Sequence, residues 1–220
     1  MLNKTFKFIF FLFIFKFFVE AQGLEEIISL YNSKISKFKE EILDLEVTQK
    51  ITVETEGMTF EERAIIYLKG DKKAKRIIEV KGKKMPEKIP DWGWILGPKI
   101  SEKDYFISLL GEEKVEDEEC FKICLKPKRV DDKLINGFIW LSKDDHGIVK
   151  MENTPLKKPS LVKELHIIHL YSKSKEGIRF LQKRTVYSTV KAIFKDVKSI
   201  TNFEYTNYKV NLGLKEEIFK

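Results

Sequence analysis

The sequence predicts an α+β fold in which a single antiparallel sheet carries most of the chain. Apolar residues recur at helical spacing over residues 24–42, and the pattern changes near residue 45 to the alternation of a half-buried strand. From residue 120 to residue 210 almost every segment alternates, and no helical pattern separates one segment from the next. Strands that follow one another without intervening helices pair in antiparallel fashion.

The first 21 residues have the layout of a secretory signal peptide. Lys4 and Lys7 precede a run of Phe, Ile and Leu, and Val19 and Ala21 suit a cleavage point after Ala21. The run is too short and too charged for a good membrane-spanning helix, which needs ~20 residues. We therefore expect cleavage there, one domain over residues 22–220, and a location outside the cytoplasm. An uncleaved N-terminal anchor is the alternative.

Residues 24–42 predict an amphipathic helix of about five turns. Its apolar stripe consists of Leu24, Ile27, Ile28, Tyr31, Ile35, Phe38 and Ile42. We expect this helix to cover the sheet of its own domain. A helix that lies on a membrane surface is the alternative.

The next part of the chain predicts a strand and a hairpin, followed by an irregular segment. The strand covers residues 45–54, and the hairpin turns around residues 70–73. Prolines at 86, 90 and 98 bracket an irregular loop that contains Trp92 and Trp94. Residues 101–111 predict a short helix, because a helix-starting pattern stands at one end and a glycine at the other.

The second half predicts strands almost throughout. The expected segments are 120–127, 137–142, 147–152, 162–172, 178–186, 187–196 and 199–210. Residues 212–219 predict one short helical turn. Cys120 and Cys124 would share one face of a strand ~13 Å apart, which is too far for a disulfide.

A search for catalytic signatures yields almost nothing. The sequence has no Gly-rich phosphate loop, no zinc-protease helix and no serine elbow. His166 and His169 would point to opposite faces of one strand, so they could not chelate a metal together. Only five of the 41 basic residues are arginines, which counts against a nucleic-acid partner. We expect no enzyme activity, no metal and no cofactor, and an envelope hydrolase is the least supported reading.

Several strand segments are apolar on both faces, notably residues 64–68, 138–141 and 165–170. A strongly curved sheet that holds a lined cavity would use both faces, and its inner face would take an apolar guest. Packing of both faces by protein is the alternative, and these two readings stay open on the residues alone.

Three stretches, taken in order, resemble the LolA-like superfamily of periplasmic outer-membrane lipoprotein-sorting proteins. Residues 120–128, CFKICLKPK, look like that family's strand with a Leu-x-Pro-Lys ending. Residues 137–152 look like its next hairpin, in which a strand with a tryptophan comes first. Residues 205–219 resemble its closing Tyr-Lys-Val-Asn segment.

This resemblance implies an unclosed antiparallel β-barrel whose helices cover the concave side. The family's carriers hold lipoprotein acyl chains there and move them across the periplasm, whereas other members bind lipids or proteins without that role. The carriers have an arginine near the end of their second strand that latches the lid. The corresponding stretch here, residues 68–70, contains no arginine.

We therefore expect a periplasmic, monomeric, non-enzymatic carrier or binder of lipoprotein acyl chains or another lipid, released to an envelope membrane acceptor. The apolar cavity and its mobile gate would be formed by Trp92, Trp94, Ile95, Leu96, Phe106 and Trp140. The alternative is an interaction module of the envelope, structural or signalling, whose barrel is filled by its own helices.

Overall fold

The computed structural model describes residues 4–82, 89–131, 134–192 and 195–220, with side chains from residue 23 onward. Ten strands form one antiparallel sheet in the order β3-β2-β1-β10-β9-β8-β7-β6-β5-β4. The strands are β1 Asp44–Thr55, β2 Met58–Lys69, β3 Lys72–Lys81, β4 Tyr105–Val115, β5 Glu118–Pro127, β6 Gly137–Ser142, β7 Ile148–Asn153, β8 Val162–Lys173, β9 Arg179–Lys191 and β10 Asp196–Val210.

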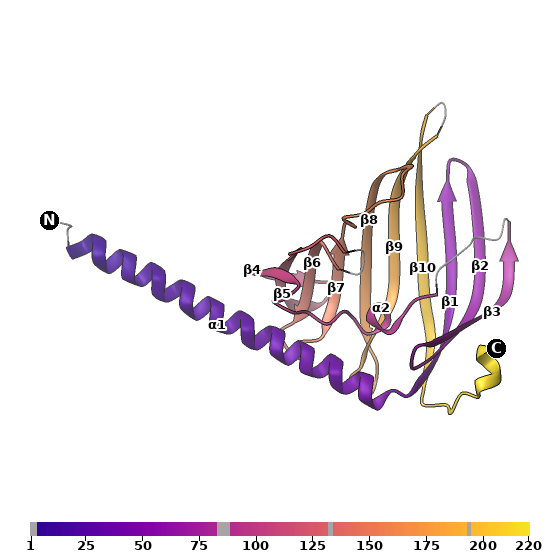
Figure 1. The fold of residues 1–220 in the computed structure, drawn as a ribbon, viewed down its shortest axis with the longest axis horizontal. Helices are drawn as coiled ribbons and strands as arrows, with labels where there is room; N and C mark the ends of the chain where they lie inside the picture. Colours follow the sequence, from indigo (N-terminus) through magenta and orange to yellow (C-terminus); the bar gives the residue numbers. More distant parts are fainter. Residues whose placement is uncertain (1–3, 83–88, 132–133, 193–194) are drawn as a thin grey trace.

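The sheet is curved and does not close, because β3 and β4 occupy its two opposite edges (Figure 1). β1 to β3 form one meander of chain neighbours, and β4 to β10 form a second. The two meanders are joined by the β1–β10 ladder, in which Leu45 pairs with Val210 and Thr55 with Ser199. The predicted α+β class with an unclosed, helix-covered sheet is therefore confirmed.

Helix α1, Lys4–Glu41, crosses the lower end of the sheet from β1 toward β4 (Figure 1). The predicted apolar stripe faces the sheet, and its members from Ile27 to Ile42 are buried in the main core. The expected amphipathic helix is confirmed as part of a longer helix. Among the residues with described side chains, no helix has the length and apolarity needed to cross a membrane.

The connection from β3 to β4 must traverse the sheet, because these strands lie at opposite edges. Its described part, residues 89–104, is here called the strap, and it crosses the concave face (Figure 1). The strap contains the one-turn helix α2, Trp92–Ile95. Asp91 caps this helix, since its carboxylate accepts a hydrogen bond from the Trp94 N–H at 3.2 Å.

The prediction of a helix over residues 101–111 is wrong. Only a turn precedes Tyr105, where the edge strand β4 begins, and its ladder with β5 runs from Tyr105–Pro127 to Val115–Glu118. Tyr105, Ile107 and Leu109 alternate toward the core, so pairing with β5 satisfies the backbone while burying one face. Tertiary pairing has overridden a weak local helix signal.

Other strand expectations are confirmed with shifted ends. The segments predicted separately at 178–186 and 187–196 are mostly one strand, β9, which ends at Lys191. The predicted terminal turn is the 3-10 helix η1, Glu216–Phe219. Cys120 and Cys124 are both buried and free, on one face of β5, as predicted.

The two-sided apolar segment at residues 138–141 is explained by protein packing on both faces. The main core fills the concave side, and a smaller cluster of Val115, Cys120, Trp140 and Val149 fills the convex side beside Phe138. For residues 138–141 the packed alternative is therefore the correct one. In other parts of the sheet, polar side chains enter the concave face.

Candidate functional site

One row of paired residues carries several polar groups of the concave face. From β2 to β7 the strand register places side by side Glu62, Ile51, Phe203, Arg184, His169 and Met151. The row continues through apolar residues into β6 and β5. Because directly paired residues project to the same face, these charged and aromatic side chains share one surface.

The centre of this row is an aromatic stack that includes a cation. The Trp94 ring stacks on His169 with ring centroids 4.8 Å apart. The Arg184 guanidinium lies 5.7 Å from the centroid of Trp94 and 4.8 Å from that of Phe203. His169 and Phe203 are buried, whereas Arg184 and Trp94 are partly exposed. Such cation–π contacts favour a guanidinium in an apolar setting.

Burial sets the ionisation of the groups around the stack. Desolvation, and then the charge of Arg184, hold the pKa of His169 well below its usual range, while the Met151 backbone acts in the opposite direction. His169 is therefore neutral at pH 7. Desolvation also raises the pKa of Tyr171, whose hydroxyl donates to the Trp94 carbonyl at 3.0 Å.

The other end of the row is internally paired. Glu62 is buried, and its carboxylate lies 2.5 Å from the Lys75 ammonium on the neighbouring strand. Two residues before Ile51 on β1, the side chain of buried Gln49 donates to the Tyr205 hydroxyl at 3.1 Å. These contacts neutralise the charge of Glu62 and anchor the Gln49 side chain.

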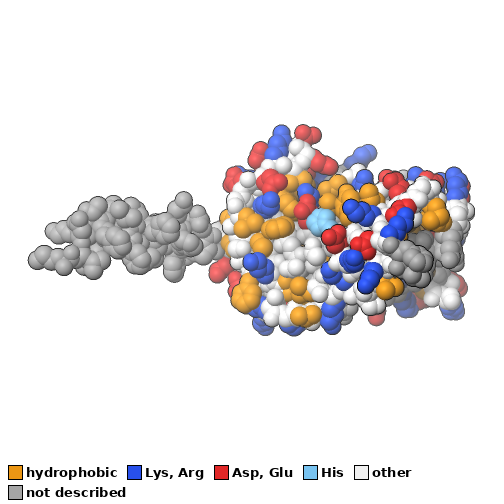
Figure 2. All heavy atoms as spheres, turned by 90° about the horizontal axis from the view of Figure 1, so that it is seen from above, with side chains coloured by type: hydrophobic (Ala, Val, Ile, Leu, Met, Phe, Trp, Pro, Cys, Tyr) orange, Lys and Arg blue, Asp and Glu red, His pale blue; other side chains and the backbone are white. Residues whose placement is uncertain are grey.

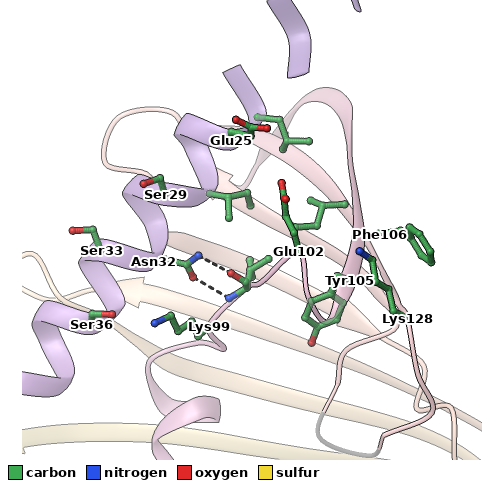
Figure 3. Close-up of a pocket in the computed structure, with 14 residues that line it drawn as sticks. Glu25, Ser29, Asn32, Ser33, Ser36, Lys99, Glu102, Tyr105, Phe106 and Lys128 are labelled. Carbon is green, nitrogen blue, oxygen red and sulfur yellow. Dashed lines mark hydrogen bonds between the residues drawn. The ribbon is translucent and has the colours of Figure 1, made fainter. Parts of the chain in front are cut away.

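A groove of about 940 Å³ opens at the β4 edge between α1, the strap and β4 (Figure 3). Its apolar lining consists of Leu24, Ile28, Ile100, Tyr105, Ile107 and, at the outer edge, Phe106. Polar side chains such as Glu25, Ser29 and Lys99 surround this lining. From the upper end of the molecule, hydrophobic side chains are interspersed with charged ones rather than gathered in one patch (Figure 2).

One residue of α1 holds the inner wall of the groove in place. The Asn32 side chain donates to the Ile100 carbonyl at 2.6 Å and accepts from the Ile100 N–H at 2.9 Å (Figure 3). The adjacent residue of α1, buried Tyr31, donates its hydroxyl to the Pro98 carbonyl at 2.7 Å. The strap is thus bonded to α1 by three hydrogen bonds.

An ion cluster fixes the same helix to the second meander. Buried Arg179 on β9 bonds Glu118 at 2.5 and 2.9 Å and Asp145 at 3.2 Å. Asp145 also pairs with Lys34 of α1 and Lys173 of β8. Burial alone would raise the pKa of Asp145, but Lys173, the Gly147 N–H and Arg179 together lower it.

The residues predicted for the site are not all brought together. The Trp92 indole donates to the Gly70 carbonyl at 2.8 Å, and Trp94 joins the central stack. Ile95 and Leu96, also in the strap, are fully buried.

Of the remaining two predicted residues, Phe106 borders the groove and Trp140 lies away from it. Phe106 is 65% exposed at the outer edge of the groove, where its ring points away from α1 and lies 5.0 Å from the Lys128 ammonium (Figure 3). Trp140 lies in the convex cluster, on the other face of the sheet from the strap.

Sequence reasoning did not single out Arg184 or give His169 a role in binding. The alternation of β8 did predict that His169 lies on the opposite face from His166. The meeting of Arg184 and His169 with Trp94 depends on a strap that crosses several strands, and no local pattern encodes it. Among the described residues, no group of three or more His, Cys, Asp or Glu side chains is placed to hold a metal ion.

No protein-family model and no curated protein matches the sequence. Solved structures do match. A DUF1329 family protein from Desulfovibrio piger has a TM-score of 0.54 and 13% identity, covering 89% of this chain and 96% of its own. A domain classed with the outer membrane lipoprotein-sorting proteins, from Vibrio parahaemolyticus, has a TM-score of 0.53 and 13% identity, with coverage of 87% and 97%. The fold is LolA-like. A LolA superfamily protein from Nitrosomonas europaea has a TM-score of 0.44 at 13% identity, with coverage of 89% and 96%.

In this LolA-like chain, a lysine stands near the end of β2 in the stretch where the resemblance implies an arginine. The Lys69 ammonium bonds the Leu214 carbonyl at 2.7 Å and pairs with Glu216 at 3.2 Å. Lys69 therefore attaches the C-terminal segment to β2, and the strap is held instead by Asn32 and Tyr31.

Proposed function

We propose that the protein is a non-enzymatic binder or carrier of lipoprotein acyl chains, or of another apolar ligand, on the concave side of its sheet. It acts in the periplasm after removal of residues 1–21, as a monomer of one domain. It needs no cofactor and has no nucleic-acid partner. A membrane of the envelope accepts the released ligand.

The groove between α1 and β4 is the observation that carries this proposal. Its volume of about 940 Å³ falls within the range of small-molecule sites. The apolar lining could accept an alkyl chain, since burying each methylene group yields ~0.8 kcal/mol. The surrounding polar side chains leave the ligand's head group in contact with water.

The strap is the proposed gate. Ile95 and Leu96 are fully buried, so they could touch a ligand only if α2 lifted from the sheet. Trp92 and Trp94 would move with it, and their hydrogen bonds to Gly70 and Tyr171 would break. Lifting the strap would join the groove to the centre of the concave face.

An envelope interaction module with a self-filled barrel is the second candidate. It is favoured by the close packing of the strap, because Ile95, Leu96 and Ile100 are at most 2% exposed. In that case the groove would be a surface feature, and a partner protein would bind elsewhere.

Two substitutions on one strand separate these candidates. Ile107→Glu places a carboxylate in the groove, whereas Leu110→Glu makes the same change on the outer face of β4. We expect a fluorescent acyl probe to bind saturably, and Ile107→Glu to weaken binding about tenfold or more because a charge enters an apolar site. Leu110→Glu should bind like the parent protein.

The carrier proposal fails if no acyl probe binds saturably at concentrations of tens of micromolar. The self-filled module then takes its place. If Ile107→Glu and Leu110→Glu lose the same amount of affinity for the probe, the ligand binds outside the groove.

A further inference from the structure

The charge of Arg184 is not balanced by any described residue. Arg179, on the same strand, bonds two carboxylates, and Arg129 pairs with Asp104 at 2.5 Å. Arg184 has only its ring contacts, and none of the described residues offers it a carboxylate. Charged side chains are almost never fully buried without a partner, so a partly buried guanidinium whose Nε–H is buried and has no described acceptor calls for an explanation.

The carboxylate in the same row is not available to Arg184. Glu62 lies on β2, three strand spacings from β9, which corresponds to roughly 14 Å. Its carboxylate is already paired with Lys75 at 2.5 Å. On β10, the strand next to β9, the residue paired with Arg184 is Phe203, whose ring contacts the guanidinium and offers no negative charge.

The stacking geometry leaves the donors of Arg184 free. The rings of Trp94 and Phe203 lie next to the guanidinium. Because an aromatic ring accepts no conventional hydrogen bond, these contacts do not satisfy the N–H groups. The Nε–H is buried without a described acceptor. Beside it, neither ring nitrogen of His169 meets a described partner with adequate hydrogen-bond geometry. A planar guanidinium fork matches a carboxylate or phosphate in shape and charge.

The adjacent row, one step farther from α1, is mainly apolar. From β2 to β8 the register places side by side Phe60, Val53, Thr201, Val186 and Ile167. Phe60 and Val186 are only partly buried. An alkyl chain could lie along this row with its polar end at Arg184.

We infer that Arg184, with His169 beside it, binds the anionic head group of a single-chain amphiphile, a carboxylate or a phosphate monoester, whose alkyl chain lies along the Phe60–Ile167 row. This inference rests on the proposed function, because it assumes that an acyl chain binds on the concave side. It places that chain along the Phe60–Ile167 row, which the groove would reach once the strap lifts. It adds a charge requirement that an apolar groove alone does not impose.

Three ligands with the same alkyl chain test the charge requirement. Tetradecanoate, tetradecyl phosphate and the neutral monotetradecanoylglycerol are titrated into the protein by calorimetry below their micelle concentrations. We expect at least one of the two anions to bind tenfold or more tightly than the neutral ligand. The anion that binds more tightly identifies the preferred head group. Raising the salt concentration from about 50 mM to about 500 mM should weaken the binding of the anion but not the binding of the neutral ligand.

Arg184→Gln should remove the preference for the anion and leave the affinity for the neutral ligand unchanged. Lys183→Gln is the matched control, since it removes the same charge from the neighbouring position on the convex face. Arg184→Lys keeps the charge without the fork and should retain part of the preference, which also guards against misfolding of the Gln variant.

The possible failures are distinguishable. If all three ligands bind equally, or if Arg184→Gln keeps the preference for the anion, the inference is overturned and the proposed function survives. If none of the three ligands binds, both are overturned.

Discussion

Arg179 and Arg184 lie five positions apart on β9, yet only Arg179 has carboxylate partners. Arg179 bonds Glu118 on β5 and Asp145 in the β6–β7 turn, while Arg184 meets aromatic rings. The alternation of β9 does not carry across this interval, because the β8–β9 ladder shifts register between Leu170 and Tyr171. It cannot reveal their partners, because every one of these partners comes from another element.

His169 should make stability depend on pH. Its pKa is held low in the folded protein, so below pH ~6.5 the unfolded chain binds more protons than the folded one. The free energy of unfolding should therefore fall with decreasing pH, by up to ~1.4 kcal/mol per pH unit. Urea unfolding between pH 6.5 and 5.5 measures this slope.

Replacing the imidazole tests the origin of that slope. His169→Phe keeps a ring against Trp94 and should flatten the dependence. His166→Phe, on the opposite face of β8, should leave it in place. An unchanged slope in His169→Phe would assign the dependence to other groups.

At the scale of elements, local patterns predict the hairpins, but they predict neither β4 nor the route of the strap. The hairpins of β2–β3 and β6–β7 follow from local turn residues and alternation. The local pattern at β4 predicts a helix, because a capping pattern and a glycine flank an alternation of only three core-facing positions, Tyr105, Ile107 and Leu109. The route of the strap depends on strand order, which no single segment carries.

Asn32 should be the main attachment of the strap to α1. Asn32→Ala removes two hydrogen bonds to Ile100 and leaves both backbone groups of Ile100 without their partner. We expect a loss of ~1–3 kcal/mol in the free energy of unfolding. Chemical denaturation measures it, and Ser33→Ala, at the next and exposed position, is the control. If Asn32→Ala lowers the free energy of unfolding no more than Ser33→Ala does, Tyr31 and packing alone hold the strap.

At the scale of the whole molecule, the order of weak motifs predicted the fold better than it predicted the site. The unclosed sheet and covering helix appear as expected. Of the six predicted site residues, Trp94 reaches the centre of the concave face, whereas Trp140 lies on the convex one. Fold depends on many positions that tolerate individual errors, and a site depends on a few that do not.

The N-terminus offers a test of export. If residues 1–21 are a cleaved signal, the protein isolated from its host should begin at Gln22 or within a residue or two of it. Mass spectrometry of the N-terminal peptide decides this. Intact Met1 on a membrane-bound chain would favour the anchor instead.

The β1–β10 ladder also sets when the sheet can be completed. Its partners Leu45 and Val210 are separated by most of the chain, and β10 is the last strand to be synthesised. Until it arrives, β1 and β9 both present open edges, and pairing over such a separation is slow. A stop codon at residue 196 would therefore remove the middle of the sheet rather than its margin, leaving two unjoined halves.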